Sequence, residues 1–292
     1  DLDRRNMFFL GRRNELCELE ERFHLEKSQL VVLFGRRRIG KSALIKHFCR
    51  DKKIFSFEGI EKTSKQNQIK NILNSLSLQI NDPFLSKLAL SGWGEVFDLI
   101  TKELAKNMAG NMNKPVLVFD EIQWLAGQQS SMIGLLKYYW DNHWKDLNIM
   151  VILCGSMAHF MVKKVIQSKA LYGRVNLEIC LQGLNPCEAR QLLAQRGELE
   201  ALKYLMIFGT VPKYLEEINQ KKSFDENVNK LCFSKNGFFI DELDKIFFSQ
   251  FREVQTYKNI VSLLARGNLT LAEIAKKLKI PVGGGLRSSL EN

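Results

Sequence analysis

Short apolar runs alternate with amphipathic stretches along the first part of the chain. The runs are Leu30–Phe34, Ile54–Phe57, Val116–Phe119, Ile149–Cys154 and Val175–Cys180. Their continuous hydrophobicity is typical of strands covered on both faces. Helical spacing of apolar residues lies between them, at residues 41–50, 65–80, 93–109, 130–144 and 157–167. This alternation predicts an α/β fold in which right-handed crossovers join parallel strands of one sheet.

After residue 182 the pattern changes to helices alone. Helical spacing covers residues 186–196, 199–219 and 223–234, and it returns at 251–265. Thr270 and Glu273 then form a capping box that opens a helix over Leu271–Leu278, followed by Leu286–Leu290. This spacing resembles a helix-turn-helix. We therefore predict an α/β core domain over 1–182, a helical lid over 183–237 and a partial winged-helix domain over 238–292, and we expect both ends to continue in a longer protein.

One motif carries a specific chemistry. Gly35-Arg36-Arg37-Arg38-Ile39-Gly40-Lys41-Ser42 matches GxxxxGK[ST], and it follows a predicted strand and opens the predicted helix 41–50. Ala43 in the first turn of that helix is expected to contact the nucleotide as well. Glycines in such a loop let backbone N–H groups form a nest for phosphate, and the helix N-terminus adds positive potential. Lys41 is expected to reach the β- and γ-phosphates, and Ser42 to ligate Mg²⁺. The side chains of the three arginines either join this site or are solvated surface residues.

Two carboxylates follow the third strand. Asp120 and Glu121 come directly after Val116–Phe119, where an aspartate can hold Mg²⁺ and a glutamate can orient and deprotonate a water. Ser156 follows the fourth strand, and it either contacts the γ-phosphate or the water, or caps the next helix. Arg174 precedes the fifth strand, and it is either a finger that reaches a nucleotide, often in a neighbouring subunit, or a surface arginine.

Composition narrows the classes of protein to which the chain can belong. Lysine and arginine exceed the acidic residues by 11, which favours polyanionic partners. No apolar run approaches the roughly 18 residues that a membrane span needs. The six cysteines form no CxxC pair, which favours free thiols in a reducing cytoplasm. The chain lacks an NKxD motif for guanine, so ATP is favoured over GTP.

Six motifs together resemble a known family. In chain order they are Phe9–Leu16 (FLGRRNEL), GRRRIGKS, VLVFDE, ILCGS, LYGR and Gly209–Leu215 (GTVPKYL). Over about residues 8–220 the chain resembles the archaeal-type ATPases of the STAND branch of AAA+ (ASCE) P-loop NTPases. The resemblance implies a five-stranded sheet of order 5-1-4-3-2, bound ATP or ADP with Mg²⁺, and a position for Arg174 where AAA+ proteins often carry a finger. It also implies that Gly11 and Arg12 flank the adenine and that the segment ending at Pro212 closes over the base.

Two functions stay open at this stage. The first is a Mg²⁺-dependent ATPase that works as a nucleotide-driven switch, with a protein partner or through self-assembly. The second is a DNA-handling ATPase that docks through the helix-turn-helix, which Lys276, Lys277 and Lys279 favour. Three glycines at 283–285 are poor helix formers, and Arg287 is the obvious base-reading residue in that helix, which weakens the second function. Glu121 argues against a third function, a scaffold with negligible turnover, and no signature of a kinase acceptor pocket is present.

Overall fold

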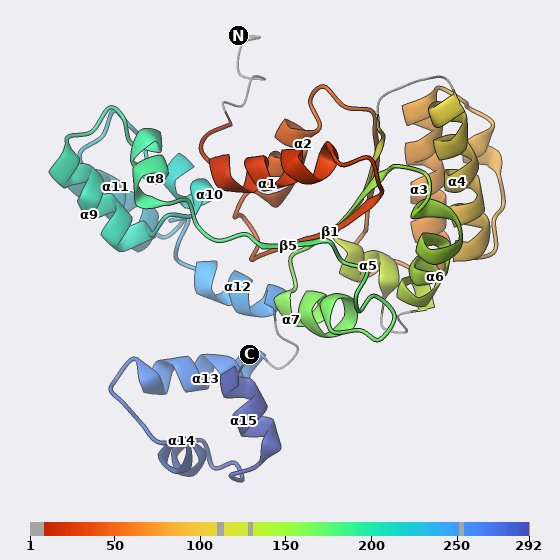
Figure 1. Cartoon of the computed structure of the whole chain (residues 1–292). Helices are drawn as coiled ribbons and strands as arrows, with labels where there is room; N and C mark the ends of the chain where they lie inside the picture. Colours follow the sequence, from red (N-terminus) through yellow and green to blue (C-terminus); the bar gives the residue numbers. More distant parts are fainter. Residues whose placement is uncertain (1–8, 110–113, 128–130, 251–253, 292) are drawn as a thin grey trace. The chain divides into compact units, whose positions relative to one another are not determined.

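The computed structural model describes residues 9–109, 114–127, 131–250 and 254–291. The chain divides into two compact units, Asp1–Gln220 and Lys221–Asn292. The boundaries expected at residues 182 and 237 stay predictions. In the first unit, helices pack around one sheet (Figure 1).

The sheet has five parallel strands in the order β2-β3-β4-β1-β5. Read from the opposite edge this is 5-1-4-3-2, so the predicted order is confirmed. The strands are β1 Gln29–Phe34, β2 Ile54–Glu58, β3 Val116–Asp120, β4 Met150–Gly155 and β5 Leu177–Cys180. Because β4 lies between β1 and β3, the chain turns in opposite directions on either side of it. Ligands in such sheets bind at this switch point, beyond the carboxyl ends of the strands.

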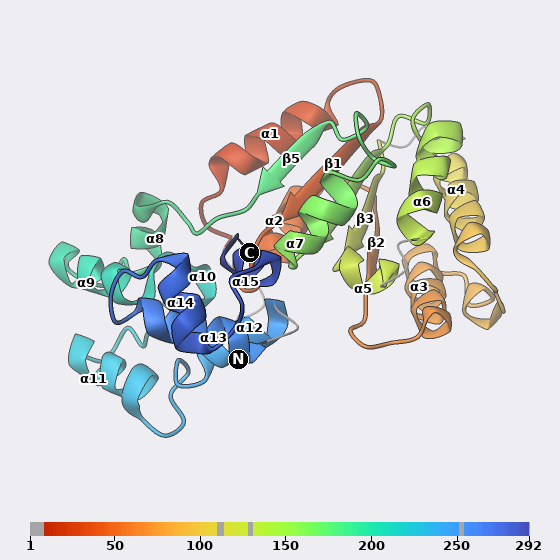
Figure 2. The same ribbon diagram turned by 90° about the horizontal axis from the view of Figure 1, so that it is seen from below.

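Helices cover both faces of the sheet. Alternate residues of a strand point to opposite faces, so Leu30 and Val32 join one large core cluster. That cluster includes side chains of α3, α4 and α6, which lie together on one side, whereas α1 and α2 pack against each other (Figure 2). The helical elements of this layer are α1 Arg13–Phe23, α2 Lys41–Phe48, α3 Lys65–Ile80, η2 Leu85–Lys87, α4 Trp93–Ala109, α5 Ile122–Ala126, α6 Ser131–Tyr139, η3 Trp140–Trp144, α7 Ala158–Phe160 and η4 Met161–Ile166.

Three further helices of the first unit follow β5. They are α8 Pro186–Leu192, α9 Glu198–Phe208 and α10 Pro212–Glu216, and they pack on one another. The prediction of one helix over 199–219 is wrong, because Gly209 adopts a positive φ of 68° that ends α9. Pro212 then occupies the first turn of α10, where its missing N–H leaves no bond unmade.

The second unit is helical in the residues described. Its elements are α11 Phe224–Val228, η5 Asn229–Phe233, α12 Glu242–Gln250, α13 Val254–Leu264, α14 Leu271–Leu278 and α15 Gly284–Glu291. The capping box of Thr270 and Glu273 opens α14 as predicted. Ile260, Ile274, Ala275 and Leu286 join the last three helices in a small core. Residue 130 and residues 251–253 of two predicted helices lie outside the described residues, and a winged-helix domain stays a prediction.

Candidate nucleotide-binding site

The phosphate loop joins β1 to α2. Arg38 and Gly40 both have positive φ, 70° and 96°, which turns successive backbone N–H groups toward a common centre. A side chain at Gly35 would collide with the carbonyl oxygen of Leu181, so the loop leaves β1 through a position that only glycine fits. Lys41 is buried, and its ammonium group donates to the carbonyls of Gly35 (2.9 Å) and Arg36 (3.1 Å). The loop therefore places a cation inside the curve of its own backbone.

The two acidic residues end β3 beside this loop. The Ser42 hydroxyl donates to Asp120 Oδ2 at 2.8 Å, and the Glu121 N–H donates to Asp120 Oδ1 at 2.9 Å. Glu121 adopts a left-handed backbone, with φ 48° and ψ 47°. A non-glycine residue in that region costs about 1–3 kcal/mol and is typical of functional sites. The two motifs thus meet in space although 78 residues separate Ser42 from Asp120.

A buried thiol lies beside the same carboxylate. Cys154 of β4 is buried near Asp120, and burial first, then the Asp120 carboxylate, raise the pKa of Cys154 well above its usual value. The neighbour of Asp120 is therefore a neutral thiol over the whole physiological pH range. It adds no charge that would compete with a cation at Asp120.

Ser156 lies against Glu121. Its hydroxyl donates to Glu121 Oε2 at 2.6 Å, and the residue is buried. The next helix begins at Ala158 with Met157 at its N-cap. The structure therefore brings Ser156 to the glutamate, and a direct contact with phosphate stays a prediction.

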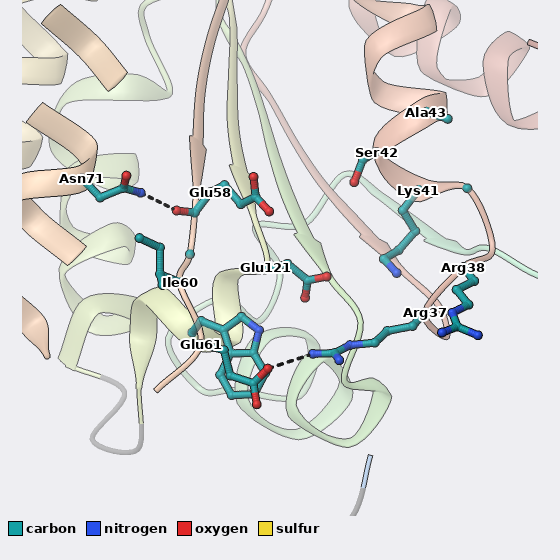
Figure 3. Close-up of a pocket in the computed structure, with 13 residues that line it drawn as sticks. Arg37, Arg38, Lys41, Ser42, Ala43, Glu58, Ile60, Glu61, Asn71 and Glu121 are labelled. Atoms are coloured by element: carbon teal, nitrogen blue, oxygen red, sulfur yellow. Dashed lines mark hydrogen bonds and ion pairs between the residues drawn. The ribbon is translucent and has the colours of Figure 1, made fainter. Parts of the chain in front are cut away.

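A cavity of about 670 Å³ opens in front of these groups. Figure 3 shows Lys41, Ser42 and Glu121 turned toward the same space. Seven of the predicted residues line it: Arg37, Arg38, Gly40, Lys41, Ser42, Ala43 and Glu121. Six lining residues were not predicted: Glu58, Gly59, Ile60, Glu61, Asn71 and Trp124. Glu58 to Glu61 could have been predicted from the order of the strands, because β2 lies next to β3 and both end at the same edge of the sheet.

Arg12 is buried, is not among the residues that line this cavity, and connects three segments. One guanidinium nitrogen donates to the carbonyls of Ile39 (2.9 Å) and Gln182 (2.6 Å), and the other to Glu15 (3.1 Å). The Arg12 backbone N–H donates to Glu188 of α8 at 2.7 Å. Gly11 has a φ of 73°, and a Cβ there would meet the Glu188 carboxylate at 2.6 Å. Adenine contacts of Gly11 and Arg12 stay predictions, whereas the side chain of Arg12 joins the phosphate loop to the segment after β5 and its backbone N–H bonds α8.

Arg36 provides a second connection from the phosphate loop to the three helices. Its guanidinium donates to the Tyr214 hydroxyl of α10 at 2.7 Å and lies 5.3 Å from the centre of the Tyr214 ring. Pro212 opens that same helix and does not line the cavity. Arg36 of the phosphate loop is thus bonded to α10, the helix that follows the segment predicted to close over the base.

Arg174 is separate from the other predicted residues. It forms two hydrogen bonds to Asp141, at 2.7 and 2.9 Å, and it lies before β5, where Asn176 pairs with Leu30 at the start of β1. The phosphate loop follows the opposite end of β1. A finger role toward the nucleotide of its own chain therefore has no geometric support, and action on a neighbouring copy stays a prediction.

We expect Asp141→Asn to lower the free energy of unfolding by about 1 kcal/mol at pH 7, because it removes ion pairs to Arg174 and Lys137. The Arg174 guanidinium, and then Lys137, lower the pKa of Asp141 to about 2 from 3.8. The stabilisation is therefore complete above about pH 4 and disappears as the pH falls through 2. Urea titrations at pH 7 and pH 2.5 should show the difference between the variant and the parent shrinking. A constant difference would contradict the ion-pair origin.

The donor groups fit Mg-ATP. Ser42 and Asp120 supply a hydroxyl and a carboxylate side by side, and Mg²⁺ prefers such oxygen ligands and completes its shell with water and phosphate. The part of the chain that the structure describes holds no cluster of three or more metal-ligating His, Cys, Asp or Glu side chains. Lys41, the two positive-φ residues and the start of α2 are the groups that would hold the phosphates. None of the helices in the described ranges is long and apolar enough to cross a membrane.

Comparison with known proteins agrees with this geometry. Residues 9–218 match the model of a family described as an ATPase domain found predominantly in Archaea. An uncharacterized protein of Methanocaldococcus jannaschii is 24% identical over 271 residues, which is 92% of this chain but 57% of that protein. An uncharacterized ATP-binding protein of the same organism is 46% identical over 48 residues, 16% of this chain and 81% of that protein.

Among solved structures, the Walker-type ATPase of Pyrococcus abyssi superposes with a TM-score of 0.73. It is 21% identical, and the match covers 97% of this chain and 88% of that one. This likeness supports the fold. Because the family model spans most of the chain, the chain belongs to the family of ATPase domains found predominantly in Archaea.

Proposed function

We propose that the chain binds ATP with Mg²⁺ in the cavity of the first unit and hydrolyses it to ADP and phosphate. The observation that carries the proposal is the 2.8 Å bond between Ser42 and Asp120, which joins the two phosphate-handling motifs. Lys41 and the loop N–H groups would hold the phosphates, and Ser42 and Asp120 would hold the metal. Bound Mg²⁺ would neutralise charge on the phosphates.

Glu121 is the base in this proposal. Water attacks the γ-phosphorus, the bond from phosphorus to the β–γ bridging oxygen breaks, and a water proton moves to the Glu121 carboxylate. The residue lines the cavity and directly follows Asp120, so base and metal ligand share one backbone. Other glutamates line the cavity, but Glu121 is the one whose carboxylate is held by the buried Ser156 hydroxyl.

Phosphate release from Mg-ATP at several protein concentrations tests hydrolysis. Constant activity per chain would support turnover within one chain. Activity that rises with concentration would support assembly and a role for Arg174 of a second copy. Binding of ATP without phosphate release under any of these concentrations would overturn the proposal of hydrolysis for this chain.

Trp124 offers a direct binding signal. All four tryptophans lie in the described ranges, and Trp93, Trp140 and Trp144 are buried in the core, whereas Trp124 lines the cavity. A change of tryptophan fluorescence on addition of nucleotide that is lost in Trp124→Phe would therefore report the cavity itself.

We further infer that the nucleotide state is transmitted from the phosphate loop to α8–α10. Two connections support this step: Arg36 to Tyr214, and Arg12 to Ile39 and Glu188. A shift of the loop on phosphate binding would change both. This chain spans 57% of the first curated relative that it matches, so the process that such a switch controls belongs to the whole protein.

We expect Tyr214→Phe to weaken this coupling while ATP still binds. The substitution keeps the ring but removes the hydrogen bond from Arg36. Because Arg36 is exposed, this bond is worth about 1 kcal/mol, which is roughly a five-fold change in the equilibrium constant that couples the loop to α10. Hydrogen exchange of the α10 amides should then respond less to nucleotide than in the parent. Tyr172→Phe is a matched control, because the Tyr172 side chain is 79% exposed. An unchanged nucleotide response in Tyr214→Phe would contradict transmission through this bond.

A second candidate function, DNA docking, rests on the exposed lysines of α14 in the second unit, Lys276 and Lys277, with Lys279 just after it. Binding of a duplex that weakens steeply with salt and is lost when the three are changed to glutamine would support it. Absence of duplex binding at low salt would exclude it.

A further inference from the structure

Gln123 is a buried amide next to the proposed base. It lies in the first turn of α5, two residues after Glu121, and 4% of its surface is exposed. Its position is set by the left-handed backbone of Glu121, which begins the helix. Sequence analysis did not single it out, because a glutamine inside an apolar helical stretch has no motif of its own.

Two donors converge on one oxygen of Glu121. The Gln123 Nε2 donates to Glu121 Oε2 and also to the Ser156 hydroxyl at 3.1 Å, and that hydroxyl donates to the same Oε2 at 2.6 Å. The three side chains thus form a closed triangle, in which each hydrogen bond strengthens the next. Within the described residues, Oε1 of Glu121 has no hydrogen-bond partner and stays available as an acceptor.

The oxygen of the Gln123 amide lacks a hydrogen-bond partner among the described residues. Its Oε1 is buried and has no hydrogen-bond partner in the described chain. A Cβ added to Gly155 would come within 2.7 Å of this oxygen, so the glycine leaves the room that the amide occupies. Flipping the amide would place an oxygen against the Glu121 carboxylate, so the orientation with Nε2 toward Glu121 is the favourable one. Buried polar atoms are usually paired, and an exception calls for an explanation.

We propose that Gln123 is a positioning residue for hydrolysis, which holds Glu121 by Oε2 so that Oε1 accepts the proton of the attacking water. The inference rests on the proposed function, since it names the group that orients its base. Together with Ser156, the amide fixes the carboxylate from the side opposite to the acceptor oxygen. Gln123 contacts neither substrate nor metal in this scheme, and its whole effect passes through Glu121.

Gln123→Met tests the proposal, because methionine keeps the length and removes the donor. We expect kcat for ATP to fall about 10- to 100-fold while KM changes less than about three-fold, since binding groups are untouched. Thermal stability should be equal or higher, because the unpaired buried oxygen is also removed. A fall in stability together with an unchanged kcat would show a packing role and overturn the proposal.

A double variant separates action through Glu121 from a general effect. In the Glu121→Gln background, Gln123→Met should cause no further loss of turnover, because residues that act as one unit are not additive. Independent losses that multiply would overturn the proposal. Gln79→Met is the matched control: the Gln79 amide bonds Ser56 of β2 and Ser75 of α3, so it should lose stability but keep kcat.

NMR without nucleotide tests the contact between Gln123 and Glu121 separately from the proposed hydrolysis. The side-chain amide protons of Gln123 should exchange slowly in NMR spectra and shift when Glu121 is changed to Gln. Fast exchange with no shift would overturn the contact itself, whatever the turnover. If Glu121→Gln keeps the parent activity, the proposed base and this inference both fail. If Glu121→Gln is inactive but Gln123→Met turns over like the parent, only this inference fails.

Discussion

Changing Glu121 to Gln is expected to lower ATP turnover by about 10²- to 10⁴-fold, the usual contribution of general base catalysis, while ATP binding stays within a few-fold of the parent. The substitution keeps the shape of the side chain, and its amide oxygen can still accept from Ser156. It removes the carboxylate that would take the proton. Phosphate release and the Trp124 fluorescence change, measured on the same samples, would separate turnover from binding.

Glu178→Gln is the control for this substitution. Glu178 is exposed on the edge strand β5 and does not line the cavity, so the same chemical change should leave turnover unaltered. Parent-like turnover in Glu121→Gln would mean that a different group activates the water. The remaining cavity carboxylates, Glu58 and Glu61, would then be the next residues to change.

The strands could be predicted because burial on both faces leaves a continuous apolar run. Val116–Phe119 and Ile149–Cys154 consist almost entirely of residues that are fully buried in the sheet. Helix α1 was missed for the opposite reason: its sequence RNELCELEERF is mostly charged, and Leu19 is its one buried residue. Leu16, Leu19 and Phe23 recur at helical spacing, but three apolar residues among so many charges give a weak signal.

The site was predicted as far as local motifs extend. Lys41, Ser42, Asp120 and Glu121 belong to contiguous motifs whose chemistry follows from residue type, and the fold brings them together. The other wall of the cavity comes from β2 and α3, where Asn71 bonds the backbone of Glu58. That wall exists only because β2 lies next to β3. Residue types alone do not reveal such a neighbour, and the assignments of nucleotide contacts stay predictions.

The arginines illustrate why charge alone is a poor guide to role. Arg36, Arg37 and Arg38 are all exposed and all adjacent, yet Arg36 bonds Tyr214 while Arg37 lies 3.4 Å from Glu61 across the cavity. Arg174 is held by Asp141 at the other end of the sheet. Each role is decided by the partner that the fold supplies, and the partners lie 24 or more residues away in sequence. Arg12 is the extreme case, since it is buried.

Arg12→Ala is expected to destabilise the first unit by about 3 kcal/mol, because removing one partner of a buried charged network leaves the others unpaired. The guanidinium accounts for hydrogen bonds to the carbonyls of Ile39, Gln182 and Gly183 and to Glu15. The left-handed backbone at residue 12 is equally strained in the parent and in Arg12→Ala, so the difference in stability between them reports the side chain. Urea unfolding monitored by circular dichroism would measure the loss.

Nucleotide binding should weaken together with stability in this variant. The Ile39 carbonyl lies in the phosphate loop, one residue before Gly40, so losing its anchor lets the loop leave the conformation that points its N–H groups inward. Arg12→Lys keeps the charge but lacks the planar fork that reaches several acceptors at once, so it should recover only part of the stability.

Arg13→Ala provides the comparison one residue along the same helix. Arg13 is exposed, so its removal should change the free energy of unfolding by no more than about 0.5 kcal/mol. Both substitutions remove one positive charge near the start of α1, and their difference therefore measures the buried network rather than charge. Equal, small effects would show that water replaces the guanidinium at the three carbonyls. The phosphate loop would then be held by its own glycines and by α2, and the bond from Arg36 to Tyr214 would be its side-chain connection to α10.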